Sequence, residues 1–522
     1  MRGGLAAIAS STREGSVRSK KDERRGSPAA VGRALVFGAS VIAASAYLLL
    51  LGSQAARGRF GTDECFHAYV SEWILAHHRF PTVMPEFYSG LYYYYQPLIH
   101  LVGALWAGAL GLSALHLLPV FLTAVTLAVL LLGARRVVPA TARAWAALLL
   151  VLNALLASFA VRLYVECLIT LLFAVAAVLV LELRRTGRLR EAVALGVVTG
   201  LALLAKFSGW LLAGLLLALA LGYALRREGP IARRLLLALG IAVALATPWL
   251  IRDQALFGSA FYPAFAPDLD RALYALNVRK FSIPVATYLR GIPTAMGPWL
   301  LAFALAGLAL ALRARRAGLR EALGLFALLG MVLVAFTPMA QARHLAPFLP
   351  VLALAAAWAV ADAVARRPWL ELAVGAVLVA AAFVKLAGLP DQRAAADPAP
   401  ELREAFEAVT PRVPENATLL SLWTYDTFYY ARRKATWPNP WGQRVHPVEL
   451  FHEQDPGRFE QDLDRYGIDY LLMPREIRAG PFNSANYPES LVRCVEALIE
   501  QGKLEMVWKS ERMALVGRVR RP

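Results

Sequence analysis

The segment ALVFGASVIAASAYLLLLGSQ, residues 34–54, decides what kind of protein this chain is. It contains no charged side chain, and as a helix it is long enough to cross a hydrocarbon core of about 30 Å. Apolar runs of about 17–22 residues recur as far as Gly388. Of all 522 residues 58% are hydrophobic and only 18% are charged. This composition excludes an ordinary soluble domain and a disordered chain, and it predicts a polytopic membrane protein.

The net charge of +18 is distributed unevenly along the chain. Residues 1–388 hold 37 Lys and Arg against 17 Asp and Glu, whereas residues 389–522 hold 18 against 20. A basic excess confined to the membrane part indicates that the cations orient the spans and contact lipid headgroups, and it does not indicate nucleic-acid binding. Because there are only three cysteines, a disulfide framework is also excluded.

The apolar stretch Pro97–Leu112 decides the topology. If it crosses the membrane, every later arginine cluster lies on the non-cytoplasmic side. If it lies along the interface as an amphipathic helix, all these clusters become cytoplasmic, so the positive-inside bias favours the interfacial helix. The clusters lie at 135–143, 184–190, 226–234, 313–320 and 366–367.

Eleven transmembrane spans then follow a basic cytoplasmic tail, residues 1–33, and the first span is interpreted as an uncleaved signal anchor. The bundle covers 34–388 and has long outer loops at 55–116 and 252–297. An odd number of spans places the C-terminal part in the periplasm or outside the cell. The predicted spans are 34–54, 117–134, 144–161, 168–183, 191–205, 209–225, 235–251, 298–312, 322–338, 345–365 and 369–388.

The C-terminal part has the pattern of a small extracytoplasmic α/β domain, residues 401–522, after a linker at 389–400. Apolar periodicity predicts helices at 401–409 and 488–501. Short apolar or β-branched runs at 417–422, 470–473 and 513–519 predict strands. The whole chain is therefore expected to be mainly α, with an α/β domain at its end.

With this topology, ionisable residues from distant parts of the sequence gather at the outer membrane face. Such groups are costly at membrane depth and usually face a cavity or a partner. Carboxylates can deprotonate a hydroxyl or hold a metal, and Lys and Arg bind phosphate oxygens. The gathered residues are Asp63, Glu64, His67, Arg162, Glu166, Lys206, Arg343 and His344.

Each group also has a purely structural interpretation. Asp63 and Glu64 could cap the helix that follows them. The charges at 162 and 166, four residues apart, could form only a surface ion pair, and the cations could anchor at headgroups. The tyrosines at 92–95 fit an aromatic belt as well as a sugar-stacking surface. The outer loop at 252–297 could be a lid or a plain connector.

Six motifs, in order, resemble those of GT-C glycosyltransferases, most closely family 39, the protein O-mannosyltransferase and lipid A aminoarabinose transferase group. The segment GTDECFHAY at 61–69 is similar to the Asp-Glu signature that follows the first span of these enzymes. The other five segments are YQPL at 95–98, VRLYVE at 161–166, GLALLAK at 200–206, PWLIRD at 248–253 and ARHLAPFLP at 342–350.

The resemblance implies roles for individual residues. Asp63 would be the base that activates the acceptor, with Glu64 supporting it. Lys206 and Arg343 would bind the donor phosphate, and His67, Tyr95, Arg162 and His344 would complete the substrate site. Glu166 replaces the usual Asp, which leaves the role of the second acidic position open. Gln96 replaces the usual Lys or His, and His116 lies where an Arg often precedes the second span, so the donor sugar and the acceptor also stay open.

These assignments predict a polyprenyl-phosphate-sugar-dependent hexosyl or pentosyl transferase in the bacterial inner membrane. A site on the outer face has no access to cytoplasmic nucleotide sugars, so the donor must arrive within the membrane. A single displacement would invert the anomeric carbon, and the acceptor would be a lipid, protein or glycan. A divalent ion, Mg²⁺ or Mn²⁺, held by Asp63 and Glu166 is an open alternative.

The sequence also leaves a different function open. The chain could be a multi-pass transporter or flippase of a lipid-linked glycan, although its span centres hold almost no ionisable residues. Cys65 and Cys167 each follow one of the outer acidic residues, so they could pair in an oxidising compartment or simply be buried as apolar side chains.

Overall fold

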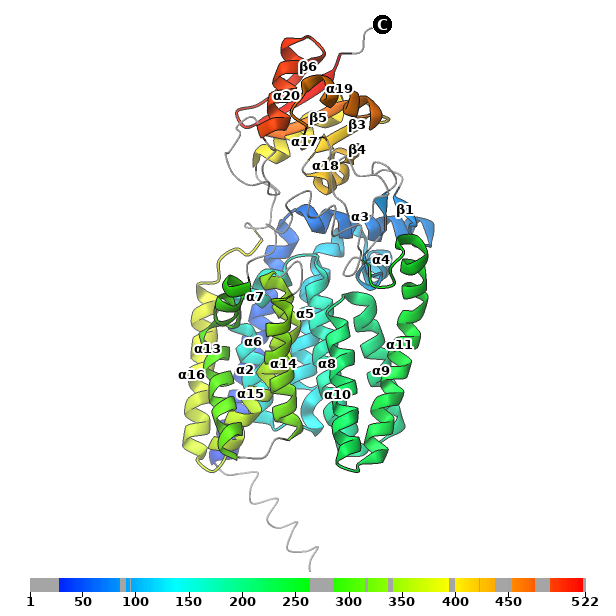
Figure 1. The fold of residues 1–522 in the computed structure, drawn as a ribbon. Helices are drawn as coiled ribbons and strands as arrows, with labels where there is room; N and C mark the ends of the chain where they lie inside the picture. Colours follow the sequence, from blue (N-terminus) through cyan, green and yellow to red (C-terminus); the bar gives the residue numbers. More distant parts are fainter. Residues whose placement is uncertain are drawn as a thin grey trace, which may run out of the picture.

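The computed structural model describes residues 28–84, 91–93, 95–262, 285–314, 318–336, 341–393, 400–421, 423–436, 450, 453–474 and 489–519. Figure 1 shows three parts along one axis: a bundle of long helices, short helices across one end of it, and a C-terminal domain beyond them. The chain is therefore a helical membrane bundle with a small domain attached at one end.

Every predicted span coincides with a helix or a helix pair, but fewer than eleven are long and apolar enough to cross a membrane by themselves. In the described residues seven helices meet that requirement, or eight if a pair bent by 70° is one span. The seven are α2 (Pro28–Arg57), η1–α5–η2 (Leu112–Arg136), α8 (Val165–Thr186), α11 (Gly229–Phe257), α13 (Val285–Ala314), η4–α15 (Ala342–Val364) and α16 (Pro368–Ala387).

The bent pair and three shorter helices occupy the remaining predicted spans. The pair consists of α6 (Ala140–Val151) and α7 (Ala154–Ala160). The others are α9 (Leu189–Ala205), α10 (Gly209–Leu225) and α14 (Leu319–Val334), which have only 16 or 17 residues. A multi-pass bundle is established by this composition, and the count of eleven spans stays a prediction.

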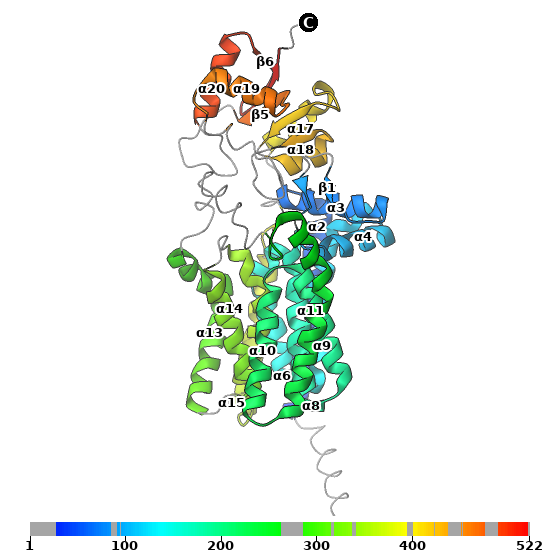
Figure 2. The ribbon, with the colours of Figure 1, turned by 45° about the vertical axis from the view of Figure 1, so that its right-hand side comes forward.

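The stretch predicted to be interfacial forms α4, Leu98–Leu110, which packs against α3, Thr62–His77. Both helices lie across the end of the bundle (Figures 1 and 2). At 1.5 Å per residue the 13 residues of α4 extend about 20 Å, which is too short for a hydrocarbon core. This arrangement agrees with an interfacial helix, and it makes α3 and α4 a roof over the bundle.

Close packing of α9 on α11 sets the position of Lys206, which follows the last residue of α9. A Cβ atom added to Gly196 would lie 2.7 Å from the Ala238 carbonyl oxygen, and one added to Gly200 would lie 2.9 Å from Leu245. Only glycine permits such close approach of two helix backbones. Larger residues there would push α9, and Lys206 with it, away from the bundle.

The C-terminal domain contains the predicted α/β fold. Its sheet has the strand order β4-β3-β5-β7-β6, and β3 is parallel to β4 and β5 while the other pairs are antiparallel. The strands are β3 (Thr418–Ser421), β4 (Lys434–Thr436), β5 (Tyr470–Pro474), β6 (Leu504–Lys509) and β7 (Met513–Arg518), and the helices are α17 (Pro400–Arg412), α18 (Thr424–Ala431), α19 (Pro456–Arg465) and α20 (Glu489–Glu500).

Three predicted features lie at least partly outside the described residues: the basic tail at 1–27, the centre of the outer loop at 263–284 and the linker at 394–399. The hypothesis that Cys65 pairs with Cys167 is wrong for this structure, in which both are free and buried thiols. The Cys167 thiol donates to the Phe159 carbonyl oxygen over 3.2 Å, so backbone contacts take the place of a disulfide.

Candidate functional site

Helix α3 presents the two acidic residues of the GTDE motif in its first turn. Gly61 is the N-cap, and its backbone N–H donates to Glu64 Oε2 over 3.2 Å. Negative charge in a first turn is favoured by the helix dipole, so the capping interpretation is correct for Glu64. Asp63, in contrast, turns its carboxylate toward the bundle, where η4 supplies Arg343.

A cavity of about 160 Å³ lies beneath α3 and is lined by side chains from five separate segments. Eight of the ten predicted site residues line it: Asp63, His67, Tyr95, Gln96, Glu166, Lys206, Arg343 and His344. Sequence reasoning missed Ile99, Tyr164, Val165, Ala205 and Gln341, which complete the lining. Of these, Tyr164 carried a signal, because it lies within the VRLYVE motif.

Two carboxylates and two cations alternate inside this cavity. Asp63 Oδ2 accepts from Arg343 Nη1 over 2.8 Å, and Glu166 Oε1 accepts from Lys206 Nζ over 2.6 Å. Arg343 Nε also lies 3.7 Å from Glu166 Oε1, so the four charges form one network. Both anions are neutralised, and both cations stay beside the cavity, where an incoming phosphate could recruit them.

Arg343 determines the protonation state of Asp63. Burial alone would raise the pKa of this carboxyl, but the charge of Arg343 and its hydrogen bond outweigh burial and hold the pKa below the usual value. His67, one helical turn further along α3, has its pKa lowered to about 4 by burial. At neutral pH the cavity therefore contains an ionised aspartate beside an uncharged imidazole.

Glu64 does not belong to the cavity lining, although it follows Asp63 directly. Its side chain is 1% exposed and pairs with Arg393, which is 2% exposed, over 2.7 Å. Glu64 Oε1 also accepts from the Leu163 backbone N–H over 2.7 Å. Arg393 lies in the linker to the C-terminal domain, so Glu64 fastens α3 to two other segments.

Arg162 also lies outside the cavity lining, and it precedes α8, which begins only at Val165. The expected pair with Glu166 on one helical face is wrong for this reason: Arg162 precedes the helix, and Lys206 takes its place. Arg162, Leu163 and Tyr164 form a turn between α7 and α8, so the helical spacing of four residues does not apply to positions 162 and 166.

Both carboxylates that could hold a divalent ion are paired with cations in this structure. Asp63 Oδ2 and Glu166 Oε1 each accept a hydrogen bond from a cationic side chain, with which a metal ion would have to compete. Across the described ranges no group of three or more His, Cys, Asp or Glu side chains gathers in a way that could hold a metal ion.

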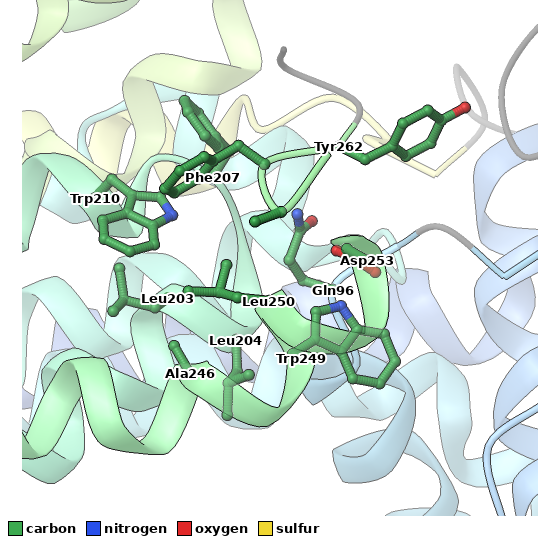
Figure 3. A pocket seen from close by; sticks show the side chains of 12 residues that line it. Gln96, Leu203, Leu204, Phe207, Trp210, Ala246, Trp249, Leu250, Asp253 and Tyr262 are labelled. Atoms are coloured by element: carbon green, nitrogen blue, oxygen red, sulfur yellow. The ribbon is translucent and has the colours of Figure 1, made fainter. Parts of the chain in front are cut away.

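A smaller hollow adjoins the cavity at Gln96, which lines both. Its other walls come from α9, the turn into α10, α11 and residues 260–262 after α11, and they are almost entirely apolar or aromatic (Figure 3). In Figure 3 Gln96 lies beside Asp253, while Trp210 and Phe207 form the opposite side. The cavity thus borders apolar surface on the α9–α11 side.

No family model and no curated protein matches this chain. Solved structures match its fold. ArnT from Cupriavidus metallidurans bound to undecaprenyl phosphate has a TM-score of 0.61 at 16% identity, over 94% of this chain and 98% of that one. The archaeal oligosaccharyltransferase AglB from Archaeoglobus fulgidus, in complex with an inhibitory peptide and a dolichol-phosphate, has a TM-score of 0.59 at 14% identity, over 84% and 69%.

At such low identity these comparisons establish the fold alone. They cover the bundle together with the C-terminal domain, so this chain shares its overall fold with these two solved structures. Membership of family 39 stays a prediction from the sequence motifs.

Proposed function

We propose that this protein is a membrane glycosyltransferase that takes a sugar from a polyprenyl-phosphate donor and transfers it to an acceptor at the membrane surface. The observation that carries the proposal is the alternating network of Asp63, Arg343, Glu166 and Lys206 inside one cavity at the end of the bundle. The lipid phosphates bound by ArnT and AglB support it, because both proteins share the fold.

In the proposed reaction Asp63 accepts the proton of the acceptor hydroxyl or amine, and the acceptor displaces the polyprenyl phosphate in a single step. This step inverts the anomeric carbon. Lys206 and Arg343 stabilise the negative charge on the departing phosphate. The apolar surface beside Gln96 borders the cavity on the α9–α11 side, and we expect the isoprenoid chain of the donor to approach along it.

Donor binding would also activate the base. In the free protein Arg343 pairs with Asp63 and lowers its basicity. A donor phosphate competes for the same guanidinium, which weakens the ion pair and raises the pKa of Asp63. Proton abstraction from the acceptor is then favoured only when the donor is in place. Until the donor binds, the ion pair with Arg343 keeps Asp63 deprotonated.

The membrane placement belongs to the same proposal. The cavity and the C-terminal domain lie at one end of the bundle, and the arginines at the C-terminal end of α8 lie a full helix length away from Glu166. The positive-inside bias then puts the cavity on the periplasmic or extracellular face of a bacterial inner membrane. Family 39 chemistry, with a lipid, protein or glycan acceptor, fits this side.

The test of function uses purified full-length protein in detergent and a panel of polyprenyl-phosphate sugars. Release of polyprenyl phosphate, followed by mass spectrometry, is the expected result for at least one donor. If a donor binds but none is cleaved, the transporter or flippase alternative gains, because it requires binding and translocation of an intact lipid-linked glycan without cleavage.

Arg343 is expected to control the pH dependence of the reaction. Since its charge lowers the pKa of Asp63, kcat/KM of the wild type should stay level from neutral pH down to about pH 5. In Arg343→Gln burial dominates, and the acidic limb of the profile should move up by about 1–3 pH units. An unchanged limb would contradict the assignment, and Arg432→Gln, outside the cavity, is the control.

Lys206→Met is expected to weaken donor binding by about 10–100-fold, because one charge-assisted hydrogen bond to phosphate is lost. The substitution also leaves Glu166 without its closest partner, so the double variant Lys206→Met/Glu166→Gln keeps the cavity neutral. If Lys206 binds phosphate, donor affinity stays low in the double variant. Full recovery there would mean that Lys206 only neutralises Glu166. Lys385→Met in α16 is the matched control.

A further inference from the structure

A chain of hydrogen bonds leads from the cavity into the buried interior of the roof. His67 Nδ1 lies 2.7 Å from His100 Nε2, and His100 Nδ1 lies 2.5 Å from the Tyr93 hydroxyl. His100 and Tyr93 are fully buried, and His67 is 3% exposed. The Arg252 guanidinium donates to the Tyr93 carbonyl oxygen over 2.5 Å and holds this end of the chain in place.

The direction of this chain follows from its proton count. The Tyr93 hydroxyl has one proton, and its two neighbours are His100 Nδ1 at 2.5 Å and the Gln96 carbonyl oxygen at 3.5 Å. The imidazole nitrogen is much the better placed acceptor. His100 then carries its proton on Nε2 and donates it to His67 Nδ1, so the proton of His67 is on Nε2.

The uncharged state that this assignment needs agrees with the surroundings. Burial lowers the pKa of His67 to about 4, and it lowers the pKa of His100 well below its ordinary value. The groups facing His67 are balanced in charge, since Asp63 and Glu166 oppose Arg343 and Lys206. Both rings are therefore neutral at physiological pH.

The remaining nitrogen of His67 faces the cavity that holds Asp63. The two side chains are four residues apart on α3 and line the same space. Within the part of the chain that the structure describes, no protein group is hydrogen-bonded to His67 Nε2. A neutral N–H group aimed into a polar cavity is a donor for an oxygen of the bound substrate.

We propose that Tyr93 and His100 are positioning residues that fix the tautomer of His67, so that His67 offers an Nε2–H donor to a substrate oxygen. This inference rests on the proposed function for its substrate. Tyr93 and His100 thereby gain a role although they lie outside the cavity lining. The proposal also predicts that His67 is protonated on Nε2 before any substrate binds.

The first test is NMR of the full-length protein labelled with ¹⁵N-histidine, without substrate, with the His67 signals identified from His67→Gln. The expected spectrum has a protonated Nε2 and an unprotonated Nδ1 in His67, unchanged between pH 6 and pH 8. In Tyr93→Phe the population of this tautomer should fall. A wild-type His67 protonated on Nδ1 would overturn the proposal, whatever reaction the protein catalyses.

The second test measures coupling in the transfer reaction. A glutamine amide can replace the Nε2–H donor, so His67→Gln should retain far more activity than His67→Leu. Tyr93→Phe should lower kcat about 10-fold in the wild type, with little change in donor KM, and should have no further effect in His67→Gln. An equal loss in both backgrounds would show a merely structural role for Tyr93 and refute the proposal.

His100→Leu interrupts the same chain at its middle and serves as a second variant if Tyr93→Phe does not fold. It should reproduce both the tautomer change and the coupling with His67→Gln. Absence of transfer by the wild type with every donor would count against the proposed function instead, and the NMR measurement would still decide the tautomer.

Discussion

Replacement of Asp63 by Asn will lower the rate of sugar transfer by about 10²–10⁴-fold, the usual contribution of a general base. Asparagine has nearly the same size, and its carbonyl oxygen can still accept from Arg343, so the cavity should keep its shape. The amide cannot take a proton from the acceptor. Donor binding should therefore persist while release of polyprenyl phosphate, followed by mass spectrometry, almost disappears.

Glu72→Gln is the matched control for this experiment, because Glu72 is another carboxylate of α3. It pairs with Arg432 at the surface of the C-terminal domain and is no part of the cavity lining. Its loss should leave the rate within about twofold, since exposed ion pairs contribute little. If Asp63→Asn is as active as Glu72→Gln, another group is the base.

The cavity could be predicted from the sequence because its residues belong to short motifs at the ends of apolar runs. The topology alone sends residues 63, 166, 206 and 343 to the same membrane face. Helix ends on one face of a compact bundle are close together, which explains why eight predicted residues line one cavity. The hydrophobic pattern thus predicts both the membrane fold and the common location of most residues of the candidate site.

Other parts could not be predicted, because they depend on contacts between distant segments with no pattern in common. Arg393 lies in a linker of ordinary polar composition, yet it is buried against Glu64, 329 positions earlier. Tyr93 and His100 lie in a tyrosine run and an apolar helix, and only the packing of α4 on α3 brings them to His67. The strands β4 and β6 have no clear alternation, so their pairing was also missed.

Loss of the Arg393 side chain is expected to have the largest effect on stability. In Arg393→Met the Glu64 carboxylate stays buried but loses its guanidinium partner at 2.7 Å. Removing one partner of a buried ion pair costs about 3–5 kcal/mol, because an uncompensated charge remains in a medium of low dielectric constant. The free energy of unfolding in detergent, measured by denaturant titration, should fall by about that amount.

Two further variants separate the buried charge from a general weakening of the domain contact. Arg432→Met removes the neighbouring but half-exposed pair with Glu72, and it should cost at most about 1 kcal/mol. The double variant Glu64→Gln/Arg393→Met removes both buried charges and should regain most of the stability lost by Arg393→Met. Because Glu64 adjoins Asp63, the transfer rate should recover together with stability. Equal, small losses for Arg393→Met and Arg432→Met would mean that the linker arginine does not hold α3, and the placement of Asp63 would then depend on Arg343 alone.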